Sequence, residues 1–189
     1  KIDKAIIPGL QGGPHDNQTA AIAVALKEAS TPAFKKYASQ IIKNSVALAS
    51  ELNTFGYDLV SGGSDNHLIL IDLRNKKVSG NVAALALERA GVILNKNGVP
   101  YDTNPPFYPS GIRMGTPAIT TRGLKEKDMK KVAKWINQAI EIVAPNEAPT
   151  DKEARTIWWK EERKKILNNK ELLKIGKEVK EFMSAYPMP

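Results

Sequence analysis

Arg113 lies in the short segment Gly111-Ile-Arg-Met-Gly115, whose spacing can present a single charged side chain. In an extended segment, alternate side chains point to opposite faces, so Ile112 and Met114 point one way and Arg113 the other. A guanidinium held on a strand suits two-pronged binding of a carboxylate or phosphate. The alternative is a structural arginine paired with an acid on a neighbouring element, and the spacing by itself favours that alternative.

A second candidate is the glycine- and proline-rich stretch Ile7 to His15, written IPGLQGGPH. Gly12 and Gly13 precede a predicted helix, and backbone N–H groups in such a turn can bind an anion. The stretch lacks the full spacing of a dinucleotide-binding or P-loop motif. On the residues alone, a tight turn between packed elements is the favoured interpretation.

Few other residues in the chain could act as metal ligands or catalytic groups. The chain has two histidines, His15 and His67, and no cysteine, so no transition-metal site is expected. Disulfides and thiolate catalysis are excluded. Asp72 is followed by Arg74, and this spacing predicts a local ion pair.

The composition describes a globular protein of one core, or of one core and part of another. Apolar residues make up 42% of the 189 residues, and no apolar run reaches the length that a membrane span needs. The formal charge is +8, but acids and bases are interleaved, which is typical of solvated helix faces. We therefore expect a cytoplasmic protein that binds neither membranes nor nucleic acid.

Three helices are predicted from apolar spacing. Residues 19–29 are alanine-rich and apolar on nearly every side, which is typical of a buried helix. A long amphipathic helix follows from a Thr31 cap to the region of Gly56, and another covers 126–143. The sequence Thr150-Asp-Lys-Glu153 has the form of a capping box that opens further helix to the C-terminus.

Strands are predicted at 58–60, 67–73, 92–94 and 111–116, with a short helix at 82–90. Residues 95–110 form a loop rich in proline and asparagine, too long for a simple connector and therefore a candidate binding loop. Together these elements predict an α/β chain with helices packed on a small mixed or antiparallel sheet.

Several longer motifs, in order along most of the chain, resemble serine hydroxymethyltransferase. They are GLQGGPH, SGGSDNHLILIDL, GVILNKNGVPYD, PFYPSGIRMGTPAITTRG and the terminal YPMP. The resemblance is weakest from Thr150 to about Gly176. It implies the C-terminal part of a fold type I enzyme that depends on pyridoxal 5'-phosphate. Residues 1–30 would end the large cofactor domain with a loop and a buried helix, and residues 31–189 would form the small domain, with helices on an antiparallel sheet and a helical extension at about 150–189.

The implied reaction is the interconversion of L-serine and glycine in one-carbon metabolism, with tetrahydrofolate as cosubstrate and a homodimer as the working form. Arg113 matches the family arginine that holds the substrate carboxylate, which reverses the preference stated above. Gly12 and Gly13 match glycines that reach the cofactor phosphate of the partner subunit. The residues that match folate-contacting positions are Lys96, Asn97, Pro105, Pro106 and Phe107.

The chain also departs from the family. The Schiff-base lysine is expected upstream of GLQGGPH, no matching motif occurs here, and so no catalytic residue is assigned and the chain alone is expected to be inactive. Asn17 and Pro105 stand where the family often has other residues. Two alternatives remain open: another pyridoxal phosphate enzyme, an aldolase of 3-hydroxy amino acids, or a non-catalytic dimerisation or RNA-binding module.

Overall fold

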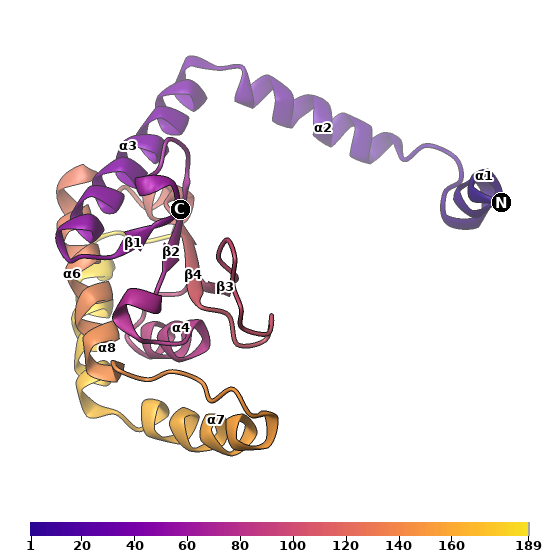
Figure 1. Cartoon of the computed structure of the whole chain (residues 1–189). Coiled ribbons are helices and arrows are strands. Elements are labelled where there is room, and N and C mark those ends of the chain that lie inside the picture. The colour runs from indigo at the N-terminus through magenta and orange to yellow at the C-terminus, as the bar shows by residue number, and fades with distance from the viewer. Residues whose placement is uncertain (189) are drawn as a thin grey trace. The chain divides into compact units, whose positions relative to one another are not determined.

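A computed structural model describes residues 1–188 (Figure 1). The chain divides into two compact units, Lys1–Ala38 and Ser39–Pro189. The first contains α1 (Ile2–Lys4), η1 (Ala5–Leu10), α2 (Asp16–Ala29) and the first turns of α3 (Pro32–Thr54). The predicted domain boundary at residue 30 stays a prediction, since the division at residue 38 does not test it.

The predicted long helix is confirmed as α3. It begins where the Thr31 side chain accepts a hydrogen bond from the backbone N–H of Phe34 at 3.2 Å, as a cap residue does. The preceding helix, predicted to be buried, is not buried within its own unit. No residue of α2 is buried, and Ile22, Val24 and Leu26 are all exposed.

The second unit is built on a four-stranded antiparallel sheet in the order β1-β2-β4-β3. The strands are β1 (Asp58–Leu59), β2 (Leu68–Asp72), β3 (Asn95–Asn97) and β4 (Gly111–Gly115). The strand predicted at 92–94 is wrong. Ile93 is exposed, and the chain pairs with β4 only from Asn95 onward, inside the segment predicted as loop.

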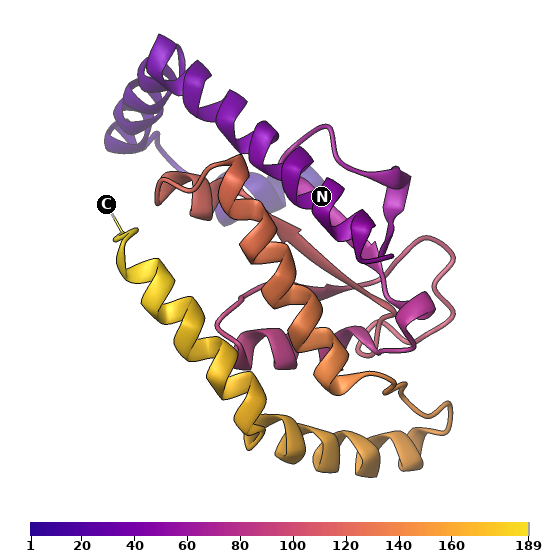
Figure 2. The same ribbon diagram turned by 90° about the vertical axis from the view of Figure 1, so that its left-hand side faces the viewer.

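Helices cover one face of this sheet. They include α4 (Gly80–Arg89), α6 (Glu126–Val143) and α8 (Lys170–Ser184), together with the C-terminal part of α3. In Figure 2, α6 and α8 run side by side in front of the sheet. The fully buried side chains of this core include Leu52, Ile69, Ile71, Leu87, Ile112, Ile136, Ile140 and Leu172.

Three short elements, η2 (Val60–Gly62), η3 (Arg74–Lys76) and α5 (Pro117–Thr121), and the helix α7 (Lys152–Leu167) complete the unit. The predicted helix over 126–143 is confirmed with those bounds as α6. The predicted cap at Thr150 is wrong by one residue, because the Asp151 side chain accepts the hydrogen bond from the Ala154 N–H. Beyond it the helix is interrupted at Asn168 and Asn169, and Asn169 caps α8.

The fold is therefore the expected one: mixed α/β, with helices on one face of an antiparallel sheet. Among the described residues, none of the helices has the length and apolar character to cross a membrane.

Candidate functional site

Arg113 lies at the middle of β4, directly opposite Leu70 of β2 and Asn95 of β3. Paired residues of neighbouring strands share a face of the sheet. Ile112 and Met114 point into the helix-covered core, so Arg113 lies on the other, open face, where it is exposed. Within residues 1–188 its guanidinium has no hydrogen-bond partner and no ion-pair partner.

The open face around Arg113 combines apolar and polar side chains. Leu68 is 40% exposed, Leu70 is half-buried, and Asn95 and Asn97 belong to the same face on the other side of β4. A cation without an ion-pair partner, bordered by leucines and asparagines, can bind the carboxylate of a small molecule. The sequence reasoning did not single out Asn95, whose position opposite Arg113 depends on the strand register.

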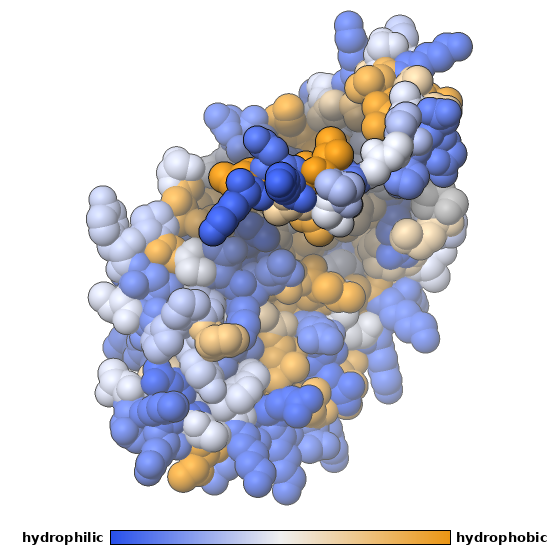
Figure 3. All heavy atoms as spheres, turned by 90° about the vertical axis from the view of Figure 1, so that its right-hand side faces the viewer, coloured by the Kyte–Doolittle hydropathy of each residue, from blue (hydrophilic) through white to orange (hydrophobic). Residues whose placement is uncertain are grey.

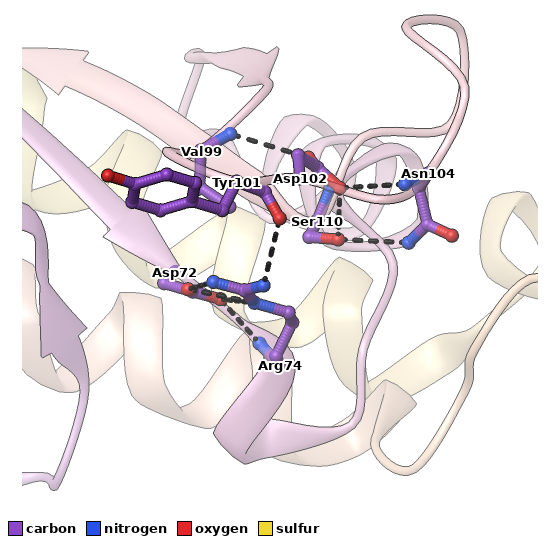
Figure 4. Close-up of polar contacts among 7 residues, drawn as sticks. All are labelled: Asp72, Arg74, Val99, Tyr101, Asp102, Asn104 and Ser110. Atoms are coloured by element: carbon purple, nitrogen blue, oxygen red, sulfur yellow. Dashed lines mark hydrogen bonds and ion pairs between the residues drawn. The ribbon is translucent and has the colours of Figure 1, made fainter.

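The loop after β3 is organised by Asp102 (Figure 4). Its carboxylate accepts hydrogen bonds from the backbone N–H groups of Val99, Asn104 and Ser110 at 3.3, 3.0 and 2.9 Å, and from the Ser110 hydroxyl at 2.8 Å. Partial burial raises the pKa of Asp102, but these bonds outweigh it and hold the pKa below its ordinary value.

Asp102 was not singled out from the sequence, although an aspartate two residues before Asn104 is the pattern of an Asx turn. Its effect is to give the candidate binding loop a defined shape. The loop therefore presents its side chains from a fixed backbone.

A second contact ties this loop to β2. The guanidinium of Arg74 donates to the Asp72 carboxylate, with Nε 2.9 Å from Oδ2, and to the carbonyl of Tyr101 at 3.5 Å (Figure 4). The predicted local ion pair is thus confirmed. Partial burial raises the pKa of Asp72, while the hydrogen bonds and charge of Arg74 lower it by more, so it lies below its ordinary value.

Lys96 and Asn97, neighbours in the sequence, lie on opposite faces of the sheet. Asn97 is opposite Gly111 and shares the face of Arg113, and its side chain donates to the carbonyl of Gly98 at 2.7 Å. Lys96 is opposite Ile112, and its Nζ donates to the carbonyl of Phe107 at 2.8 Å. Of this pair, only Asn97 shares the Arg113 face.

The proline-rich turn beyond this lysine is exposed, and the Phe107 side chain is 76% exposed. Pro105 and Phe107 line a cleft of about 570 Å³ together with Lys96, whereas Pro106 does not. The structure thus brings Lys96, Pro105 and Phe107 together on one side and leaves Arg113 and Asn97 on the other.

Gly12 and Gly13 belong to the first unit and are exposed. A Cβ added to either glycine would meet no described atom within 4 Å. His15 precedes the first residue of α2, and among the described residues no cluster of side chains is suited to a metal ion.

The basic run Arg163 to Lys165 is where the RNA-binding alternative would be tested, and its charge is partly neutralised. Lys165 pairs with Glu162 at 2.6 Å on the same helix. This local pairing gives no support to a nucleic-acid surface.

Comparison with known proteins places these residues in a family context. Residues 1–136 match the sequence profile of the family described as serine hydroxymethyltransferase. The matching part ends within α6, so α7 and α8 lie outside it.

Curated relatives agree with this match. A serine hydroxymethyltransferase of Acidothermus cellulolyticus is 57% identical over 143 residues, which is 76% of this chain and 34% of that protein. Proteins of the same name from Desulfotalea psychrophila and Sorangium cellulosum are 55% and 51% identical over 74% and 75% of this chain, and 33% and 34% of their own lengths. The chain therefore spans about a third of the length of the curated relatives it matches.

Proposed function

The chain belongs to the serine hydroxymethyltransferase family, and from this premise we propose that it is the C-terminal part of a cytoplasmic, homodimeric glycine hydroxymethyltransferase. The enzyme would interconvert L-serine and glycine with tetrahydrofolate as cosubstrate and pyridoxal phosphate as cofactor. The absence of cysteine agrees with a reducing compartment.

The observation that carries this proposal is the unpaired guanidinium of Arg113 on the open face of the sheet. Its task would be to hold the carboxylate of serine or glycine through two parallel hydrogen bonds. Because β4 is paired on both sides, the arginine is mounted on a rigid element. A carboxylate fixed there also fixes the direction of the Cα–Cβ bond that is to be broken.

The folate contacts are proposed for Lys96, Asn97, Pro105, Pro106 and Phe107. The support is that β3 and the loop ordered by Asp102 hold these residues at one edge of the sheet. Asn97 would meet the cosubstrate on the side of Arg113, and Lys96 on the side of the cleft.

The residues of this chain do not make a pyridoxal phosphate site by themselves. The first unit leaves free space around Gly12 and Gly13, and the chain lacks a lysine in the motif that the family uses for attachment. We assign to these glycines only a contact with the cofactor phosphate of the partner subunit. The chain alone would therefore not cleave serine.

Substitution of Arg113 in the full-length enzyme tests this function. In Arg113→Ala and Arg113→Lys, we expect the KM for serine to rise about 100-fold, because a two-pronged charged hydrogen bond is lost. Arg163→Lys, at an exposed arginine of α7, is the matched control and should leave the KM unchanged.

An unchanged KM for serine in Arg113→Lys would refute the carboxylate role. Serine cleavage that does not depend on tetrahydrofolate would instead indicate an aldolase of 3-hydroxy amino acids.

A further inference from the structure

The strand that carries Arg113 is tied to α3 immediately after its last residue, Gly115. Thr116 is fully buried, and its hydroxyl donates a hydrogen bond to the backbone carbonyl of Ile41 in α3 at 2.8 Å. Thr116 is also the N-cap residue of α5, a position where a threonine hydroxyl ordinarily accepts a bond from its own helix. Within the described residues its side chain makes no such cap, so the hydroxyl serves the contact between β4 and α3.

Two further buried side chains complete this contact. The Thr120 hydroxyl donates to the backbone carbonyl of Thr116 at 2.7 Å. The Asn44 amide donates to the Thr120 hydroxyl at 2.8 Å and to the carbonyl of Leu124 at 2.9 Å, and its oxygen accepts a bond from Gln40 at 3.0 Å. Both polar atoms of this fully buried amide therefore have partners inside the protein, as burial requires.

The link between these side chains and Arg113 is short and closely packed. Only Met114 and Gly115 separate Arg113 from Thr116. A Cβ at Gly115 would lie 3.0 Å from the carbonyl oxygen of His67, and the Thr116 backbone N–H donates to the same carbonyl at 3.2 Å. A shift of Thr116 would therefore move the backbone that carries Arg113.

The Arg113 side chain has no ion-pair partner of its own within residues 1–188. It lies on the face of the sheet turned away from α6 and α8. Figure 3 shows the molecule from that side, with hydrophobic and hydrophilic residues interspersed. The position of the guanidinium thus depends on the backbone of β4. Asp102 and Ser110 hold this strand where it begins, and the contact with α3 holds it where it ends.

We propose that Asn44, Thr116 and Thr120 are positioning residues for substrate binding, which hold β4 against α3 so that Arg113 meets the carboxylate of serine. The inference rests on the proposed function of Arg113. A contact that served stability alone would not require these hydroxyls, because apolar groups of the same shape can replace a buried hydrogen-bonded pair at little cost. Hydrogen bonds instead fix one geometry, and a binding constellation must be held to within about 0.5 Å.

The test measures the KM for serine in the full-length enzyme. Thr116→Val keeps the shape of the side chain and removes the hydroxyl, and we expect the KM to rise about 10-fold. Thr116→Ser keeps the hydroxyl and should keep the wild-type KM. Tyr57→Phe is the matched control, since it removes a buried hydroxyl that bonds to Asn137 at 3.2 Å. Tyr57 precedes β1, which does not pair with β4, so its loss should leave the KM unchanged.

A double substitution shows whether the effect passes through Arg113. If Thr116 acts by placing this arginine, Thr116→Val should cause no further rise in KM in an Arg113→Ala background. Thermal melting shows that each variant is folded before its KM is interpreted. If Thr116→Val does not fold, Thr120→Val carries the same comparison.

Three outcomes would overturn the positioning role and leave the proposed function standing. They are an unchanged KM in Thr116→Val, an equal rise in Tyr57→Phe, and a rise by the same factor with and without Arg113. An unchanged KM in Arg113→Ala would instead overturn the proposed function and this inference with it.

Discussion

Asp102 and Ser110 are joined by two hydrogen bonds, from the Ser110 backbone N–H at 2.9 Å and from its hydroxyl at 2.8 Å. The pair closes the loop that carries Pro105, Pro106 and Phe107 and delivers the chain into β4. One carboxylate thus sets both the shape of the proposed folate loop and the start of the strand that carries Arg113.

Replacement of Asp102 by alanine should loosen this loop. We expect Asp102→Ala to lower the free energy of unfolding by about 1–3 kcal/mol, because backbone donors in a half-buried loop lose a charged acceptor. Urea unfolding of the chain measures the loss. Asp151→Ala, which removes an exposed helix cap, should cost less, about 1 kcal/mol. An equal cost for the two variants would contradict the organising role of Asp102.

The same carboxylate should make stability depend on pH. The pKa of Asp102 is lower in the folded chain than the ordinary value of about 3.9. Its contribution is therefore fully present above that value and is lost as the pH falls through the folded pKa. The difference in unfolding free energy between the wild type and Asp102→Asn should be larger at pH 7 than at pH 2.5. A difference that stays the same at both values would show that the carboxylate is not ionised in these bonds.

The two faces of the sheet should respond differently to truncation. Ile112 is fully buried under the helices, and Ile112→Ala should cost about 2–5 kcal/mol of unfolding free energy. Leu68, on the open face, is 40% exposed, and Leu68→Ala should cost less than about 1 kcal/mol in this chain. Chemical denaturation of both variants measures these costs. Similar losses of unfolding free energy in the two variants would argue against an open face.

Gly111 should tolerate no side chain. A Cβ at this position would lie 2.5 Å from the carbonyl oxygen of Ile71 and 2.5 Å from a methyl group of Val99. We expect Gly111→Ala to lower the unfolding free energy by about 1–3 kcal/mol through overpacking. Gly63→Ala is the control, because a Cβ there meets no atom within 4 Å. A stable Gly111→Ala chain would mean that β2 and β4 can separate without cost.

The sequence by itself determined the elements whose signal is local. The spacing of apolar residues predicted α6 with its observed bounds and α3 with its Thr31 cap, because one face of a helix must meet a core at every turn. Alternation in Gly111 to Gly115 predicted β4 and the direction of Arg113. The family motifs then indicated a role for that arginine which spacing alone did not favour.

Only the tertiary structure decided the features that depend on segments far apart in the sequence. The third strand was predicted at the apolar residues 92–94 but lies at Asn95–Asn97, because these residues pair with β4. That register places Lys96 and Asn97 on opposite faces and puts Asn95 beside Arg113. The tertiary structure also gave α7 a place opposite the Phe107 turn. Strand register and burial are properties of pairs of segments, so no single stretch of sequence contains them.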